Sequence, residues 1–220
     1  MAAEVLNLHG LSPAGKPTSP DGFPDSSLDG TKDYLCQFQP DRGLFYICTM
    51  HAADGSNRSC FLGDRKHLFA ASHYNPANGS KIVLESTLLN GSSSAGPQWG
   101  VFTAKSDGSS LTACYNIRGV AADPQWWRDG SMIAVNVAPA INGNGNGWKI
   151  NYPGCNRPVH LTSFFEPIEA SDPGPSPDGT HVAFEWNDWG NGQSSRTCAI
   201  GVLDYEQRRP APAEHRSGLQ

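Results

Sequence analysis

Three residues with metal-binding side chains stand at similar places along the chain. His73, Asp123 and Asp172 each lie a few residues before a turn and an alternating apolar segment. Carboxylate oxygens bind hard cations and imidazole nitrogens bind borderline ones, so together they predict a site for a divalent cation such as Ca²⁺ or Mn²⁺. Asp123-Pro124 and Asp172-Pro173 are also turn-forming dipeptides, and the alternative is that they only cap the starts of strands.

A second candidate site consists of aromatic and polar side chains around loops rich in Gly, Asn and Ser. These loops span residues 88–98, 138–147 and 188–196. Indole faces pack on the C–H groups of sugar rings, and amide or carboxylate groups bond sugar hydroxyls, which predicts a carbohydrate-binding surface. Its candidate residues are Trp99, Trp148, Trp189, Asn144, Asn146, Asp188 and Gln193. The alternative is that the tryptophans fill the space between packed sheets.

No motif identifies a catalytic residue. The sequence contains no Gly-x-Ser-x-Gly nucleophile motif, no His-Glu-x-x-His zinc motif and no phosphate-binding loop. The isolated histidines are interpreted as structural or exposed. The sequence therefore leaves open whether the protein is an enzyme.

The composition favours a fold of many short strands joined by tight turns. The 220 residues include 24 Gly and 17 Pro, and only 17% are charged. The net charge of −5 argues against a nucleic-acid partner. No segment reaches the roughly 18 apolar residues of a transmembrane helix, and residues 1–11 lack the pattern of a signal peptide. We therefore expect a soluble all-β protein.

One pattern recurs at the spacing of roughly 40 to 50 residues that is typical of propeller blades. An Asn-Gly or Asp-Gly turn precedes an alternating strand in NPANGSKIVLES (75–86), PQWWRDGSMIAVNV (124–137), PSPDGTHVAFEWN (175–187) and, more weakly, SSLDGTKDYLCQF (26–38). Such dipeptides supply the positive φ values of a hairpin turn, and the alternation directs one face of the strand to the core. Each copy therefore predicts a β-hairpin.

A second strand-turn-strand element follows each copy, as in LFYICTMHAADGSNRSCFL (44–62) and WGVFTAKSDGSSLTACY (99–115). Two successive hairpins form a four-stranded antiparallel meander, which is the blade of a β-propeller. The segments PDGTHVAFEW and VFTAKSDGSSLT resemble the TolB-type propeller repeat, and the resemblance extends over about residues 23–206. It implies the fold but no particular activity.

The fold class that we expect is all-β: a β-propeller with four blades of four antiparallel strands, in a single domain over residues 1–207. The last blade ends after its third strand, and residues 3–9 have the alternation of the missing strand. We expect this N-terminal strand to close the ring and cover its open edges. The alternative is a fragment of a six- or seven-bladed propeller. Residues 208–220 are Pro-rich and polar, and predict a disordered tail.

A weaker resemblance links residues 72–86 to the propeller-fold oligogalacturonate lyases, which hold a divalent metal through histidines and a glutamine. It implies that His73 is a ligand and that Gln125 is nearby. Asp123 and Asp172 occupy the places in the other blades that match His73, where the family has histidine. Glu85, Asn136 and Glu185 also occupy matching places, on the second strands, which predicts polar contacts between blades.

The sequence is compatible with three functions. The first is a binding module that recognises a carbohydrate or protein ligand on the long-loop face, which is the face of the propeller that carries the loops 88–98, 138–147 and 188–196. The others are a metal-dependent polysaccharide lyase or other carbohydrate-active enzyme, and a TolB-like scaffold or assembly protein.

Cys48 and Cys60 flank the Asp54-Gly55 turn symmetrically, so an oxidising compartment would allow a cross-strand disulfide. We expect an extracytoplasmic or secreted protein; the oligomeric state is not predicted.

Overall fold

The computed structural model describes residues 21–27, 29–39, 44–63, 66–88, 92–93, 96–115, 120–138, 145–165, 167–188 and 197–205. These ranges contain strands and turns and no helix, so the predicted all-β class is confirmed. Within them, no helix long and apolar enough to cross a membrane is found.

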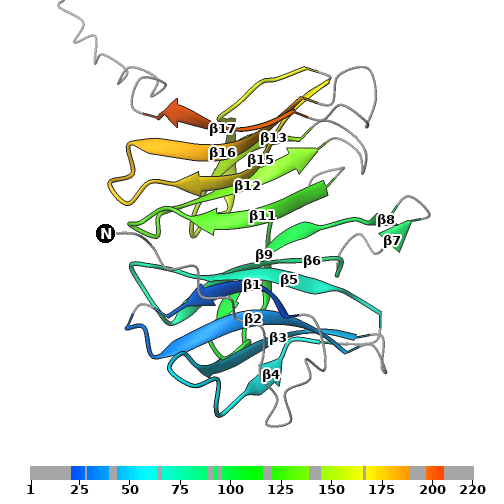
Figure 1. Ribbon diagram of the computed structural model, residues 1–220, viewed down its shortest axis with the longest axis vertical. Helices are drawn as coiled ribbons and strands as arrows, with labels where there is room; N and C mark the ends of the chain where they lie inside the picture. Colours follow the sequence, from blue (N-terminus) through cyan, green and yellow to red (C-terminus); the bar gives the residue numbers. More distant parts are fainter. Residues whose placement is uncertain are drawn as a thin grey trace, which may run out of the picture.

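The strands form four antiparallel sheets in chain order, which we call blades 1 to 4 (Figure 1). Blade 1 contains β1 (Asp21–Ser26), β2 (Lys32–Gln39), β3 (Leu44–His51) and β4 (Ser59–Phe61). Blade 2 contains β5 (Phe69–Tyr74), β6 (Lys81–Ser86), β9 (Gly100–Lys105) and β10 (Thr112–Tyr115). Between β6 and β9, a small hairpin pairs β7 (Ser92–Ser93) with β8 (Gly96–Pro97).

Blade 3 contains β11 (Val120–Trp126), β12 (Met132–Ala138), β13 (Asn146–Asn151) and β14 (Asn156–His160). Blade 4 contains β15 (Ile168–Pro175), β16 (His181–Asp188) and β17 (Thr197–Asp204). The N-terminal strand expected at residues 3–9 and the tail expected at 208–220 lie outside the described residues.

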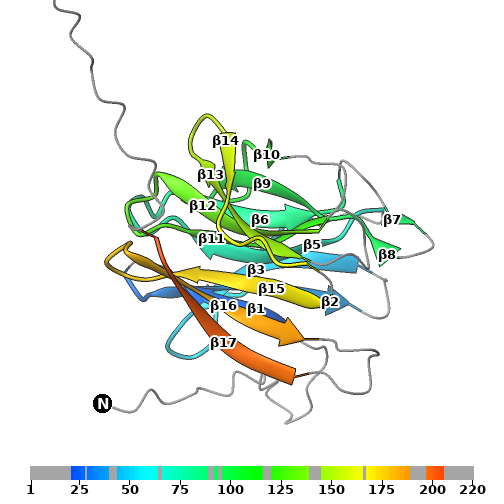
Figure 2. The same cartoon turned by 90° about the horizontal axis from the view of Figure 1, so that it is seen from above.

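The first strands of the blades are the inner ones. β1 packs against β5, β5 against β11, and β11 against β15. Figure 1 shows the sheets stacked in this order, with blade 1 and blade 4 at opposite ends, and Figure 2 shows the same stack from above. This succession of antiparallel meanders around inner strands is a propeller arrangement, as predicted. The described residues do not close the predicted four-bladed ring, because blades 1 and 4 lie at opposite ends of the stack.

The Asp-Gly turns have the predicted backbone conformation, but Gly79 of the Asn-Gly turn does not have the predicted positive φ. Gly130 and Gly179 have φ values of +67° and +75°, a region that glycine enters without steric cost. In each turn the preceding aspartate closes a local ring: Oδ1 of Asp129 accepts the N–H of Ser131 at 3.0 Å, and Oδ1 of Asp178 accepts that of Thr180 at 3.0 Å. These local interactions explain why the hairpins could be found from the sequence.

Apolar side chains fill the three spaces between consecutive blades. Successive residues of a strand point to opposite faces of the blade, so they pack against different neighbouring blades. On β6, Ile82 and Leu84 pack toward blade 1, whereas Val83 packs toward blade 3. The space between blades 3 and 4 is filled by Trp127, Ala134, Leu161, Val182 and Tyr205. Blades 2 and 3 are therefore covered by a neighbouring blade on both faces.

Two disulfides are present. Cys48–Cys60 joins β3 to β4, as predicted. Cys114–Cys155 joins β10 of blade 2 to the turn after β13 of blade 3. The second disulfide was not predicted, because its partners come together only when two blades pack. Among the described residues, Cys198 on β17 is a free, exposed cysteine.

Candidate functional site

The inner strands share a β-bulge. Their pairing with the second strand shifts between Gly22 and Asp25, Ala70 and His73, Ala122 and Gln125, and Ser171 and Gly174. In blades 2 to 4 the first bulged residue has a positive φ: +44° at Ala71, +53° at Asp123 and +47° at Asp172. A residue other than glycine keeps this strained conformation only when its surroundings impose it, and such residues cluster at functional sites.

The strand pairing at the bulges shows which residues of the inner strands are equivalent between blades. It places Ala71, Asp123 and Asp172 in one set of equivalent positions, and His73, Gln125 and Gly174 in another. The expectation that Asp123 and Asp172 replace His73 was therefore wrong by two residues. The physical reason lies in the turns. All four inner strands share the bulge, but the turn of blade 2 is one residue longer: Tyr74 pairs with Ile82, whereas Trp126 pairs with Ile133 in blade 3.

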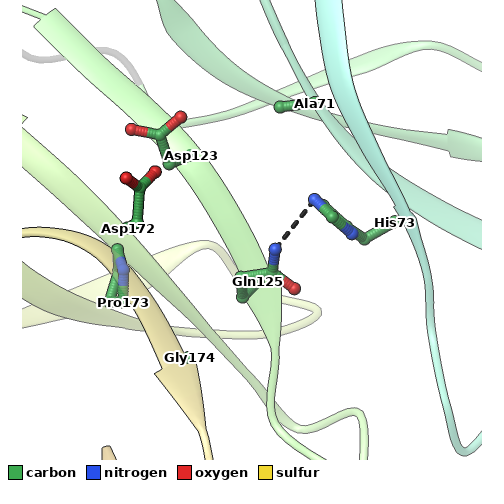
Figure 3. A pocket seen from close by; sticks show the side chains of 7 residues that line it. All are labelled: Ala71, His73, Asp123, Gln125, Asp172, Pro173 and Gly174. Carbon is green, nitrogen blue, oxygen red and sulfur yellow. Dashed lines mark hydrogen bonds between the residues drawn. The ribbon is translucent and has the colours of Figure 1, made fainter. Parts of the chain in front are cut away.

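Both sets of positions meet in one pocket (Figure 3). It has a volume of ≈ 260 Å³ and is lined by Ala71, His73, Asp123, Gln125, Asp172, Pro173 and Gly174. β5, β11 and β15 each contribute, so the pocket lies on the inner side of blades 2 to 4.

The carboxyl groups of Asp123 and Asp172 point toward each other across the pocket (Figure 3). Burial, followed by the charge of Asp172, raises the pKa of Asp123 to about 7. Burial and the charge of Glu185 also raise the pKa of Asp172. Because two negative charges side by side are unfavourable, the pair holds a proton more tightly than an isolated carboxyl group does. The pair thus offers one hydroxyl donor beside carboxylate acceptors.

Glu85 supports this pair from behind. The side chain is only 4% exposed on blade 2, and its Oε2 accepts the backbone N–H of Asp123 on blade 3 at 2.8 Å. Burial is the main cause that raises the pKa of Glu85 to about 8, and the charge of Asp123 adds to it. The predicted polar contact between blades is therefore present at Glu85. On blade 4, Glu185 accepts the hydroxyl of Ser171 at 3.2 Å.

His73 is held by residues of blades 1 and 3. Its Nε2 lies 2.8 Å from Nε2 of Gln125, and its Nδ1 lies 3.7 Å from Oδ2 of Asp25. Because an amide nitrogen only donates, Nε2 of His73 accepts in this orientation, and the ring proton of the neutral form lies on Nδ1, toward Asp25. Asp25 was missed by the sequence analysis, since the repeat is weakest in blade 1.

The three predicted metal ligands share the pocket but not a coordination sphere. His73 turns its Nε2 to Gln125, whereas Asp123 and Asp172 face each other at the other side of the pocket (Figure 3). In the described part of the chain, no group of three His, Cys, Asp or Glu side chains is placed to hold a metal ion.

The four described residues of the predicted sugar-binding set, Trp99, Asn146, Trp148 and Asp188, are not among the residues that line the pocket. Trp148 is half-buried against the cluster between blades 2 and 3, and its ring centroid lies 3.6 Å from that of His160. Oδ1 of Asn146 accepts the hydroxyl of Thr162 at 3.0 Å and the N–H of Phe164 at 2.8 Å. Trp99 is half-buried before β9, and Asp188 ends β16. Trp189, Asn144 and Gln193 lie outside the described residues.

No protein-family model matches the chain, and no curated protein matches it in sequence. Solved structures do match it. TolB from Acinetobacter baumannii has a TM-score of 0.58 and 16% identity, over 82% of this chain and 43% of that chain. An oligogalacturonate lyase in complex with manganese has a TM-score of 0.63 and 12% identity, over 87% of this chain and 52% of that chain.

The β-propeller domain of the Trilobed protease from Pyrococcus furiosus has a TM-score of 0.54 and 9% identity, over 85% of this chain and 55% of that chain. The chain thus has a β-propeller fold and resembles the TolB-type propellers, as the repeat implied. It spans about half the length of these structures.

Proposed function

We propose that this chain is a propeller binding module that holds a carbohydrate in the pocket on the inner side of blades 2 to 4. The observation that carries the proposal is the shared bulge, which brings Asp123, Asp172, His73 and Gln125 to one pocket from three blades. The same strained backbone conformation occurs in three blades. This recurrence supports a common functional role for the side chains that it brings into the pocket.

The chemistry of the pocket suits a ligand with several hydroxyl groups. A hydroxyl donates one hydrogen bond and accepts others, and the Asp123–Asp172 pair and the Gln125 amide each offer both a donor and an acceptor. The residues that line the pocket include no Lys or Arg, which favours a neutral sugar over an acidic one. The volume of ≈ 260 Å³ is near the lower end of ligand pockets, roughly 300 Å³, and suits one sugar ring.

A metal-dependent lyase is the second candidate, because one similar structure is an oligogalacturonate lyase in complex with manganese. The described residues do not fit a metal: His73 directs its Nε2 to Gln125, and among these residues no group of three His, Cys, Asp or Glu side chains is placed to hold an ion. We therefore derive no metal-dependent step. Metal analysis of the purified protein tests this candidate, and a stoichiometric ion would revive it.

The cysteines support a location in an oxidising compartment. Two disulfides, Cys48–Cys60 and Cys114–Cys155, fix β4 and the junction of blades 2 and 3. Such bonds persist outside the reducing cytosol. We therefore propose an extracytoplasmic or secreted protein.

Titration calorimetry with the full chain and a panel of neutral and acidic monosaccharides and oligosaccharides tests the proposed binding. Gln125→Ala and Asp172→Asn should weaken binding of the best neutral sugar by on the order of 10-fold or more, since each removes a directional hydrogen bond. Asn156→Ala removes an exposed amide from β14 and should leave the affinity unchanged. Equal affinity in all four proteins, or no binding to any sugar, would contradict the proposal.

A further inference from the structure

The residues that line the pocket carry acidic groups and no cationic group. Asp123 and Asp172 point toward each other across it, and the seven lining residues include no Lys or Arg (Figure 3). In the arrangement described above, His73 supplies no positive charge, because its Nε2 accepts from Gln125 and its single ring proton faces Asp25. A cleft lined by charge of one sign attracts a ligand of the opposite sign.

Further carboxyl groups lie near the pair. Burial and the charge of Asp172 are the main causes that raise the pKa of Asp123. The charges of Glu169 and Glu185, on blade 4, raise it further. Glu85 is buried on blade 2 and accepts the backbone N–H of Asp123. Buried carboxyl groups this close repel one another when they ionise, and a cation among them relieves that repulsion.

Hydrogen-bond acceptors around the pocket also lack donors. Asn136 on blade 3 is equivalent to Glu85 on blade 2, since each pairs with the residue before the bulge. Oδ1 of Asn136 is buried and has no hydrogen-bond partner in the described part of the chain. Gln125 uses its Nε2 to donate to His73, so its Oε1 remains as an acceptor in the lining. A ligand with several N–H donors fits these surroundings better than one with acceptors.

We propose that the ligand is an amino sugar whose primary ammonium group binds between the carboxyl groups of Asp123 and Asp172, an inference that rests on the proposed carbohydrate binding. An ammonium group has three donors and no acceptor, and it is close in size to the hydroxyl group that it replaces on a sugar ring. Its hydrogen bonds to carboxylates are charge-assisted, and are roughly twice as strong as those between neutral groups.

Titration calorimetry of the full chain tests the inference at about pH 6, where a primary amine is protonated. The probes are glucose, galactose and mannose, together with their derivatives that carry an amine at C2 or at C6. The N-acetyl forms of the same amino sugars are the uncharged controls. At least one amino sugar should bind on the order of 10-fold more tightly than both its parent sugar and its N-acetyl form.

A matched pair of variants tests where the charge acts. Asp172→Asn keeps the shape of the side chain and removes its charge, so the preference for the amino sugar over its parent should disappear. Asp129→Asn removes a carboxylate from an exposed turn of blade 3, outside the pocket lining, and should leave the preference unchanged. Asparagine suits that turn, because Asn78 accepts the N–H of Ser80 in the same way in blade 2. Circular dichroism checks folding, and Asp123→Asn is used if Asp172→Asn does not fold.

Amino sugars that bind no more tightly than their parent sugars would overturn the inference, and so would a preference that the Asp172→Asn variant retains. Binding of the parent sugars in that case would still support the proposed function. Methylammonium has the charge without the ring and should bind far more weakly than the best amino sugar. Equal binding of methylammonium would overturn an amino sugar as the ligand, and the absence of binding to every sugar would contradict the proposed function as well.

Discussion

The backbone N–H of Asp123 donates a 2.8 Å hydrogen bond to Oε2 of Glu85, so the bulge of blade 3 is anchored on a buried side chain of blade 2. The anchor fixes the backbone at the residue whose carboxyl group faces Asp172. The geometry of the pocket therefore depends on the packing of one blade on the next.

Two substitutions of Glu85 should distinguish the contribution of its hydrogen bond to stability from the contribution of its charge. Because the raised pKa keeps Glu85 largely protonated at neutral pH, Glu85→Gln retains the acceptor and should change the free energy of unfolding little. Glu85→Ala leaves the N–H of Asp123 without its partner and opens a cavity, and should cost about 2 to 4 kcal/mol. Chemical denaturation measures both. Equal destabilisation by Gln and Ala would show that the carboxylate charge matters instead.

Stability should fall as pH rises through neutrality. Burial raises the pKa of Glu85 to about 8 and that of Asp123 to about 7. In the unfolded chain both carboxyl groups titrate near their ordinary values, roughly 4. Between these limits the folded state holds protons that the unfolded state has released, so the free energy of unfolding decreases with pH and levels off above about pH 8.

Thermal melts across roughly pH 5 to 8 measure this slope. Glu85→Gln should flatten it, because glutamine does not titrate. A melting temperature that increases over the same interval in the wild-type chain would contradict the assigned direction of both pKa shifts.

Trp148→Ala should destabilise the fold rather than remove a ligand contact. The ring packs against the cluster between blades 2 and 3 and against His160. Its loss should lower the free energy of unfolding by about 2 kcal/mol or more, and Trp148→Phe should restore part of it. If the alanine variant instead melts like the wild type and loses retention on a polysaccharide column, Trp148 is a sugar-stacking residue.

The two disulfides should contribute unequally. Cys114–Cys155 closes a loop with a sequence separation of 41, against 12 for Cys48–Cys60. Chain entropy then gives about 4 kcal/mol for the longer loop and about 3 kcal/mol for the shorter. Denaturation of the paired Cys→Ser variants compares them, and a larger loss on removal of Cys48–Cys60 would argue against this order.

The fold could be predicted because each hairpin carries its own local signals. Asp129-Gly130 and Asp178-Gly179 specify turns through one side-chain hydrogen bond and one positive φ, and the strands that follow alternate with period two. Repetition of these signals then indicated blades. Cys48–Cys60 was also predictable, because it spans one such turn.

The site was predictable only in part. His73, Asp123 and Asp172 were singled out and do share a pocket. His73 is nevertheless equivalent to Gln125, because the turn of blade 2 is one residue longer than that of blade 3 and the periodic pattern does not show where the extra residue lies. Asp25 was missed for a different reason. Its blade has the weakest repeat, and its contact with His73 exists only once blade 1 packs on blade 2.

The most direct test of the proposed pocket is a ¹H–¹⁵N NMR titration of the full chain with the neutral sugar that binds best. Binding in the pocket should shift the backbone amides of Asp123, Gln125 and Gly174, which lie in its lining. The amides of Gly55, Gly108 and Gly179, in the Asp-Gly turns, should stay unchanged. Shifts confined to those turns, or a saturating sugar that leaves the amides of the pocket unmoved, would contradict the claim that the bulged inner strands form the binding site.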